Sequence, residues 1–131
     1  MIRIVLADDH AQFRAYLKAL LEQQPGLHVV GEAAHGQAVI DLLSTWGPDL
    51  APDVVLMDVE MPGIGGAEAT RVLRARHPAL GVIALSLHHD PHVVAAMQEA
   101  GAHAYLVKGD PLLELVQAIT RVAASASGPL S

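Results

Sequence analysis

The side chains that could carry chemistry in this chain stand directly after short apolar segments. Asp8 and Asp9 follow the first such segment, and Asp58 follows the third. Ser86 ends the fourth segment, and Lys108 follows the fifth. If these segments are parallel strands, their carboxyl ends meet in one crevice, at the point where the strand order reverses. We therefore expect three carboxylates, a hydroxyl and an ammonium to share one site.

A site of this composition suits phosphoryl transfer. Clustered carboxylates repel one another unless a cation joins them, and oxygen ligands without Cys or His favour Mg²⁺. The Lys108 ammonium supplies positive charge on the opposite flank, and Ser86 supplies a hydroxyl donor. Beside a metal ion and a lysine, an aspartate can act as the nucleophile that accepts a phosphoryl group as an acyl phosphate. The residues thus predict a phosphoryl-accepting aspartate with Mg²⁺ as its cofactor.

The elements that must position these residues alternate along the chain. Apolar runs rich in β-branched residues predict strands at 2–7, 27–30, 54–57, 82–85 and 104–107. Most of these runs are continuously apolar, as in a parallel sheet covered on both faces. Apolar residues at helical spacing predict helices at 13–21, 38–43, 67–75, 92–100 and 111–124. Strand followed by helix, five times over, predicts an α/β fold with a (βα)5, doubly wound, five-stranded parallel sheet.

Composition limits the class of protein. The 131 residues fit one domain, and 52% of them are apolar against 17% charged, which excludes intrinsic disorder. No apolar stretch is long enough to span a membrane, and the early acidic residues argue against a signal peptide. The chain has no cysteine, and its formal charge of -6 argues against direct nucleic-acid binding. We expect a cytoplasmic domain that contacts neither a membrane nor nucleic acid.

Two stretches depart from the alternation of strand and helix. Residues 45–52 carry two prolines and a glycine, which predict a surface loop before the third strand. Residues 125–131 are mostly small and polar, and they predict a tail or the start of a linker. We therefore place a single domain at 1–124 and the tail or linker at 125–131.

Four motifs carry a family resemblance. They are Asp8-Asp9-His10, the run Asp-Val-Val-Leu-Met-Asp at 53–58 with Met-Pro-Gly at 61–63, Ser86, and Tyr-Leu-Val-Lys at 105–108. In this order, over residues 2–124, they resemble the receiver domain of two-component response regulators. The opening motif and the ending Gly-Ala-x-x-Tyr-Leu-x-Lys are most similar to the LuxR/NarL-type subfamily, which carries a helix-turn-helix output domain. The resemblance implies a flavodoxin-like, receiver-like sheet with strand order 2-1-3-4-5.

The resemblance assigns the phosphoryl acceptor and the metal ligands. It implies that Asp58 accepts a phosphoryl group from a sensor histidine kinase or a small acyl phosphate. Asp8, Asp9, Asp58 and the backbone carbonyl of Glu60 would hold Mg²⁺. The implied activity is self-phosphotransfer followed by slow autodephosphorylation, so the domain would be a signalling switch and not a turnover enzyme.

The resemblance also assigns the residues that respond to the phosphoryl group. Lys108 would pair with it, Ser86 would hydrogen-bond to it, and Tyr105 would be the switch aromatic that turns inward as Ser86 moves. The output surface would be the fourth helix, fifth strand and fifth helix, or else the first and fifth helices. The sequence does not decide whether phosphorylation produces a homodimer, or which kinase acts on the domain.

The chain departs from the family pattern in three places. The interval from Asp9 to Asp58 is 49 residues, longer than expected, and we assign the excess to the loop at 45–52. Gly109 follows Lys108, where many receivers have a proline. No output domain follows Ser131, so we expect either a piece of a longer regulator, whose missing domain binds DNA, or a stand-alone receiver.

Other functions fit the residues less well. A receiver-fold interaction module that no longer uses phosphate is disfavoured because every expected site residue is present. A hydrolase of the haloacid-dehalogenase type would need a second aspartate where Glu60 stands. A flavodoxin-like redox protein would need a hydroxyl-rich phosphate loop after the first strand, where Asp8 and Asp9 would repel a flavin phosphate.

The histidines leave questions open. His88, His89 and His92 suggest a metal site, but the proline between them disfavours a helix and no cysteine completes a ligand set, so we expect a solvated loop. His10 either caps the first helix or lines the acidic pocket. We also hypothesise that His88 and Glu60 control how fast water reaches the acyl phosphate.

Overall fold

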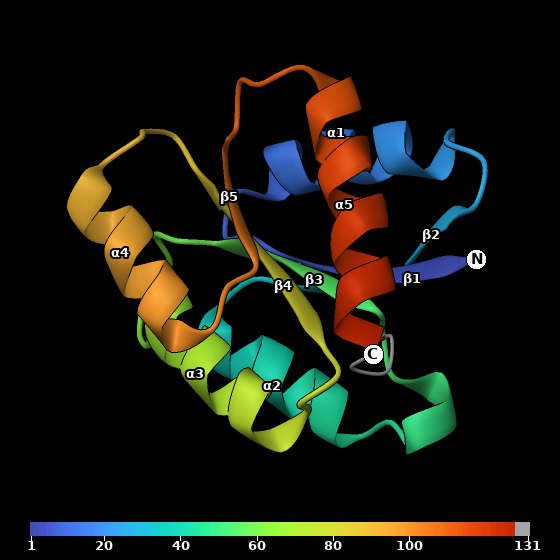
Figure 1. The fold of residues 1–131 in the computed structure, drawn as a ribbon, viewed down its shortest axis with the longest axis horizontal. Helices are drawn as coiled ribbons and strands as arrows, with labels where there is room; N and C mark the ends of the chain where they lie inside the picture. The colour runs from blue at the N-terminus through green and yellow to red at the C-terminus, as the bar shows by residue number, and fades with distance from the viewer. Residues whose placement is uncertain (128–131) are drawn as a thin grey trace.

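Strands and helices alternate along the chain (Figure 1). The computed structural model describes residues 1–127. The strands are β1 (Ile2–Ala7), β2 (Leu27–Ala33), β3 (Val54–Asp58), β4 (Gly81–Ser86) and β5 (Ala104–Val107). The helices are α1 (Ala11–Glu22), α2 (Gly36–Ser44), α3 (Gly66–Arg76), α4 (Pro91–Ala100) and α5 (Leu112–Ser127). A short 3-10 turn, η1 (Pro48–Leu50), lies in the loop predicted at 45–52.

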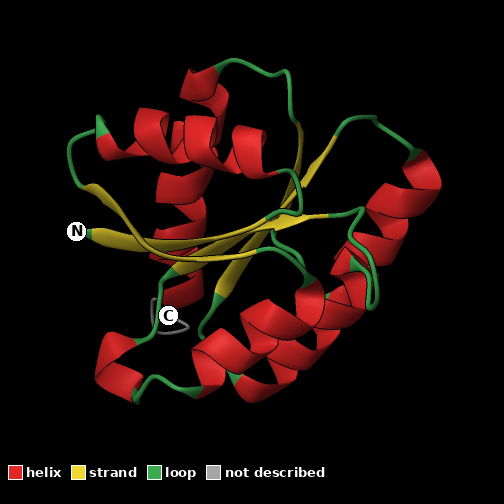
Figure 2. Ribbon diagram, turned by 180° about the vertical axis from the view of Figure 1, so that it is seen from behind, coloured by secondary structure: helices red, strands yellow, loops and turns green. Residues whose placement is uncertain are grey.

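The five strands form one parallel sheet in the order β2-β1-β3-β4-β5. Helices α1 and α5 cover one face of the sheet, and α2, α3 and α4 cover the other (Figure 2). The predicted doubly wound α/β fold and its strand order are confirmed. Because β1 and β3 are neighbours whose following helices lie on opposite faces, a crevice opens at the carboxyl ends of these two strands.

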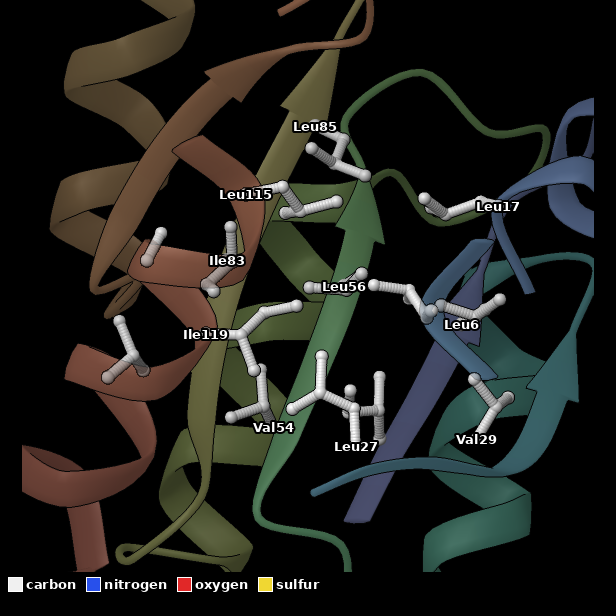
Figure 3. Close-up of a cluster of buried hydrophobic side chains, with 14 of the residues drawn as sticks. Leu6, Leu17, Leu27, Val29, Val54, Leu56, Ile83, Leu85, Leu115 and Ile119 are labelled. Atoms are coloured by element: carbon white, nitrogen blue, oxygen red, sulfur yellow. The ribbon is translucent and has the colours of Figure 1, made fainter. Parts of the chain in front are cut away.

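Alternate residues of each strand supply two hydrophobic cores. Leu6, Leu56 and Ile83 lie on the face covered by α1 and α5, where Ile119 packs with them (Figure 3). Their chain neighbours, such as Met57, pack against the helices of the other face. Each fully buried side chain of this size contributes about 1.5–3 kcal/mol to folding relative to an exposed one. The two cores hold the sheet rigidly and so fix where its strands end.

The edge strand β2 is longer and less regular than predicted. It continues beyond Val30 because residues 31–33 pair with the end of β1. The register shifts between Ile4 and Val5, so β2 carries one residue more than β1 at this point. The prediction stopped too early because a glycine and an exposed glutamate interrupt the apolar run.

Helix α5 also continues beyond its predicted end at Ala124 and reaches Ser127. The predicted helix was therefore too short by residues 125–127, because alanine and serine extend an existing helix at little cost. The assignment of 125–131 as a tail or the start of a linker stays a prediction. The rest of the predicted tail, residues 128–131, lies outside the described residues. No helix within residues 1–127 is long and apolar enough to cross a membrane.

Gly66, the first residue of α3, lies against the backbone that follows Asp58. A Cβ at this position would lie 2.6 Å from the Asp58 carbonyl oxygen and 2.9 Å from the Val59 Cα. Neither backbone atom can move without shifting the end of β3. We predict that Gly66→Ser lowers the free energy of unfolding by about 1–3 kcal/mol, as measured by urea denaturation.

Gly65 is the matched control for this substitution. A Cβ there would meet its nearest atom, the Val59 carbonyl oxygen, at 4.0 Å. Gly65 also occupies the N-cap position of α3, where serine is favoured. Gly65→Ser should therefore leave stability unchanged or slightly raised, and equal losses in the two variants would contradict the steric argument.

Candidate functional site

The carboxyl ends of β1 and β3 bring three aspartates together. Asp8 and Asp9 follow β1, Asp58 is the last residue of β3, and the two strands are neighbours in the sheet. One ligand atom from each of Asp8, Asp9, Asp58 and His10 lies within 4.8 Å of the others. The structure thus gathers the three carboxylates that were expected to meet, and it adds the His10 ring to the group.

Lys108 reaches this cluster from the end of β5. Its ammonium lies 2.8 Å from Asp8 Oδ2 and 3.5 Å from Asp58 Oδ2, and its side chain is only 5% exposed. The ammonium also lies 4.8 Å from the centre of the Phe13 ring, a cation–π contact that helps to orient it. Lys108 therefore provides a buried positive charge beside the carboxylates.

Asp58 has an incomplete set of partners. Its side chain is 3% exposed, its Oδ1 accepts the Glu60 backbone N–H at 3.1 Å, and its Oδ2 accepts no hydrogen bond. Burial raises the pKa of Asp58 to about 6; repulsion by Asp8 adds to this rise and attraction by Lys108 opposes it. One ammonium does not neutralise three carboxylates. A buried oxygen without a partner in this cluster fits a hard divalent cation.

The end of β1 is held in place by α1. Asp8 Oδ1 accepts the His10 backbone N–H at 2.8 Å, and the Asp8 carbonyl oxygen accepts a hydrogen bond from the Arg14 guanidinium. Arg14 also pairs with Glu32 of β2 at 3.1 Å. This positioning role of Arg14 was not predicted from the sequence. The feature that would have revealed it is the placement of Arg14 one helical turn after His10, whose carbonyl accepts the Arg14 backbone N–H.

Asp9 and His10 form the open side of the site. The Asp9 side chain is 31% exposed and that of His10 is 59% exposed. His10 Nδ1 lies 3.4 Å from one oxygen of Asp8 and 3.4 Å from one oxygen of Asp9, and the ring makes no capping hydrogen bond to α1. Of the two alternatives for His10, the structure supports the one in which its ring lines the acidic pocket.

Ser86 and Tyr105 lie on neighbouring strands, β4 and β5. Ser86 is buried and follows Leu85, the residue that pairs with Asp58 between β3 and β4. Its Oγ accepts the His88 backbone N–H at 3.2 Å, and the Tyr105 hydroxyl donates to the His88 carbonyl oxygen at 2.8 Å. The loop between β4 and α4 therefore connects the expected phosphoryl contact with the expected switch aromatic.

The side chains of the other residues considered as ligands do not belong to the aspartate cluster. Glu60 has an exposed side chain, and the role of its backbone carbonyl as a metal ligand stays a prediction. Within residues 1–127, the group around Asp58 is the only set of three or more side chains that could hold a metal, so His88, His89 and His92 form no such set. All three histidines are exposed, as expected for a solvated loop.

A cleft of about 670 Å³ opens beside the cluster. The residues that line it include Asp9, His10, Gln12, Phe13, Leu87 and Lys108. The cleft therefore gives a small molecule or a partner side chain access from solvent to Asp9, His10 and Lys108.

The fold and the site together define a doubly wound α/β domain with an acidic cluster and a buried lysine at its topological switch point. Residues 4–120 match the family model described as the response regulator receiver domain. The chain belongs to this family.

Individual relatives agree with the family match. Response regulator GacA of Pseudomonas viridiflava is 43% identical over 122 residues, which are 93% of this chain and 55% of the relative. The crystal structure of a LuxR-family two-component response regulator from Aurantimonas sp. SI85-9A1 has a TM-score of 0.85 and 37% identity, covering 94% of this chain and 85% of that chain. The signal receiver domain of NarL from Mycobacterium tuberculosis has a TM-score of 0.84 and 34% identity, covering 93% and 95%.

These matches confirm the resemblance to LuxR/NarL-type receivers. The chain spans about half the length of the curated relatives it matches, such as the 55% of GacA.

The raised pKa of Asp58 predicts that its charge destabilises the metal-free protein. A carboxyl whose pKa is higher in the folded chain costs stability above that pKa, and the cost disappears as the pH falls toward the unfolded value. With EDTA at neutral pH, we expect Asp58→Asn to raise the free energy of unfolding by about 1–3 kcal/mol in urea denaturation.

This gain should shrink as the pH is lowered from about 6 toward the ordinary value of 3.8. Asp49→Asn is the control, because Asp49 is an exposed aspartate in η1. A loss of stability in Asp58→Asn, or a gain that is the same at every pH, would show that the Asp58 charge is not the cause.

Proposed function

We propose that Asp58 accepts a phosphoryl group from a sensor histidine kinase, with Mg²⁺ as the cofactor, and that the domain relays this modification to an output. The Asp58 Oδ2 oxygen carries the proposal: it is buried, accepts no hydrogen bond and lies 3.5 Å from the Lys108 ammonium. A buried ion pair that served only stability would have its remaining lone pairs satisfied by hydrogen bonds. An oxygen left free beside an ammonium suits an incoming electrophile.

The proposed step is a displacement at phosphorus. Asp58 Oδ2 forms the new bond, and the bond from phosphorus to the imidazole of a phosphohistidine, or to the carboxylate of an acyl phosphate, breaks. The leaving group takes the electron pair. Asp58 must be ionised for this attack, and its pKa of about 6 allows this at neutral pH.

Charge on the transferring group is balanced from two sides. Mg²⁺ held by Asp8, Asp9, Asp58 and the Glu60 carbonyl would neutralise the equatorial oxygens on one side. The Lys108 ammonium does so from the other side, and its 2.8 Å contact with Asp8 holds it there before transfer. Asp8 thus both contributes to the cation site and positions the lysine.

The phosphoryl group would change contacts in the loop between β4 and α4. Ser86 Oγ accepts the His88 N–H, which leaves its own proton free to donate to a phosphoryl oxygen. Movement of Ser86 toward that oxygen carries the His88 backbone with it, and the His88 carbonyl holds the Tyr105 hydroxyl. A local charge change is thereby linked to the surface of α4, β5 and α5.

The chain matches only 55% of the length of GacA. The role of the whole protein is therefore a proposal drawn from its relatives. We propose that the parent protein acts in the cytoplasm and regulates transcription, with DNA bound by a helix-turn-helix output domain and not by these residues. A stand-alone receiver and a phosphate-independent interaction module are the alternatives.

The phosphoryl acceptor can be tested with acetyl phosphate. We expect incubation with acetyl phosphate and Mg²⁺ to add one acid-stable, base-labile phosphoryl group, detected by intact-protein mass spectrometry. Asp58→Asn should gain no mass, because an amide oxygen is a poor nucleophile, and EDTA should suppress the reaction of the wild-type protein.

The same experiment separates the alternatives. A wild-type protein that never gains mass would favour the phosphate-independent module. An adduct that persists in Asp58→Asn would show that a different residue is the nucleophile.

A further inference from the structure

We infer that Phe13 is a positioning residue for phosphoryl transfer, because the face of its ring holds the Lys108 ammonium beside Asp58. This inference rests on the proposed function and adds a residue to it. Phe13 lies in the first turn of α1, and the centre of its ring is 4.8 Å from Lys108 Nζ. Phe13 acts through the lysine and not on the reacting atoms themselves.

The backbone of Lys108 does not determine where its ammonium lies. The Lys108 N–H donates to the Ser86 carbonyl oxygen at 2.7 Å, which fixes the start of the side chain. The following Gly109 adds no packing restraint, since a Cβ there would meet no atom within 4 Å. A lysine ammonium stands at the end of a long flexible stem. Its position is therefore set by the groups that it contacts.

The two carboxylates alone hold the ammonium unevenly. It lies 2.8 Å from Asp8 Oδ2 and 3.5 Å from Asp58 Oδ2, and the attraction between charges grows as the distance falls. The Phe13 ring attracts the ammonium through its quadrupole and carries no net charge. The ring thus restrains the direction of the ammonium without neutralising it, and the positive charge stays available to the phosphoryl group.

Two cavities leave the ammonium room to turn away. One of about 220 Å³ is lined by residues of α1, β5 and α5, and the other is the cleft of about 670 Å³ beside the carboxylates. Phe13, Lys108 and Gly109 line both of them. The Phe13 ring also packs against the hydrophobic core on the α1 and α5 face of the sheet. The core therefore anchors the ring, and the ring in turn restrains the lysine.

An apolar contact and a cation–π contact at Phe13 can be told apart by fluorination. Fluorine withdraws electron density from the ring face, which weakens its attraction for a cation, but it leaves the shape and apolar character of the ring nearly unchanged. Phe13 is the only phenylalanine of the chain. Protein synthesis with fluorinated phenylalanine therefore alters this position alone.

The test compares the initial rate of phosphorylation by acetyl phosphate and Mg²⁺, followed by intact-protein mass spectrometry. We expect monofluorinated phenylalanine at position 13 to slow the reaction about twofold, and trifluorinated phenylalanine or Phe13→Leu to slow it about tenfold. A contact with an ammonium that is only 5% exposed should lie toward the strong end of the cation–π range. Urea denaturation should show that fluorination does not destabilise the protein.

Tyr16→Leu is the matched control for loss of a ring. Tyr16 is 62% exposed on the same helix, and within residues 1–127 only Phe13 places a ring over the Lys108 ammonium. This variant should be phosphorylated at the wild-type rate. If Phe13→Leu does not fold, the two fluorinated proteins still decide the question, because they retain the ring.

A second readout detects the contact without phosphorylation. In fluorine NMR spectra of the monofluorinated protein, Lys108→Met should shift the single signal, because it removes the ammonium over the ring. Lys18→Met should leave the signal in place, since Lys18 lies on α1 but pairs with Glu32 at 3.3 Å.

The outcomes separate this inference from the proposed function. If the wild type is phosphorylated but the rate does not depend on fluorination, or if the fluorine signal ignores Lys108→Met, the inference is wrong and the proposed function stands. If the wild type gains no phosphoryl group, the proposed function fails and the positioning role of Phe13 fails with it.

Discussion

The contact of one buried ammonium with two carboxylates is the interaction on which the rest of this structure depends. Lys108 reaches from the end of β5, past β4, to Asp8 after β1 and Asp58 in β3. Without this ammonium, the aspartates would be buried with no compensating charge, at a cost of several kcal/mol per ion. The Lys108 ammonium therefore lowers the free-energy cost of burying the carboxylates at the carboxyl ends of the strands. It also supplies the positive charge of the site.

The Lys108 ammonium offsets only part of the negative charge of the aspartates, and the site is therefore sensitive to an added ion. A balanced ion pair with every lone pair satisfied would gain little from an added ion. Here the Asp58 Oδ2 oxygen keeps an unused lone pair, and burial raises the pKa of its carboxyl to about 6. A cation or a phosphoryl group changes the local balance of charge strongly. The two hydrophobic cores hold the strands, whereas the exposed loop after β4 contacts both Ser86 and Tyr105 through hydrogen bonds of the His88 backbone.

The sequence was sufficient for those features that follow from strand topology. Asp8, Asp58 and Lys108 each follow or end an apolar strand, and parallel strands bring their ends to one edge whatever the side-chain details. The end of β2 was not predictable, because residues 31–33 are held by pairing with β1 and not by their own apolar pattern. The orientation of His10 was equally hidden, since it depends on one backbone hydrogen bond to Asp8.

The register shift between β1 and β2 bears on strand pairing between separate molecules. Because β2 carries one residue more than β1 between Ile4 and Val5, its outer edge is bent and twisted at mid-length. A bent edge holds its free N–H and C=O groups out of line for a flat strand from another chain, and the exposed His28 and Glu32 side chains add polar obstruction. The opposite edge, β5, has only four residues. Both borders of the sheet thus carry features, an irregular register and a short edge strand, that disfavour intermolecular strand pairing.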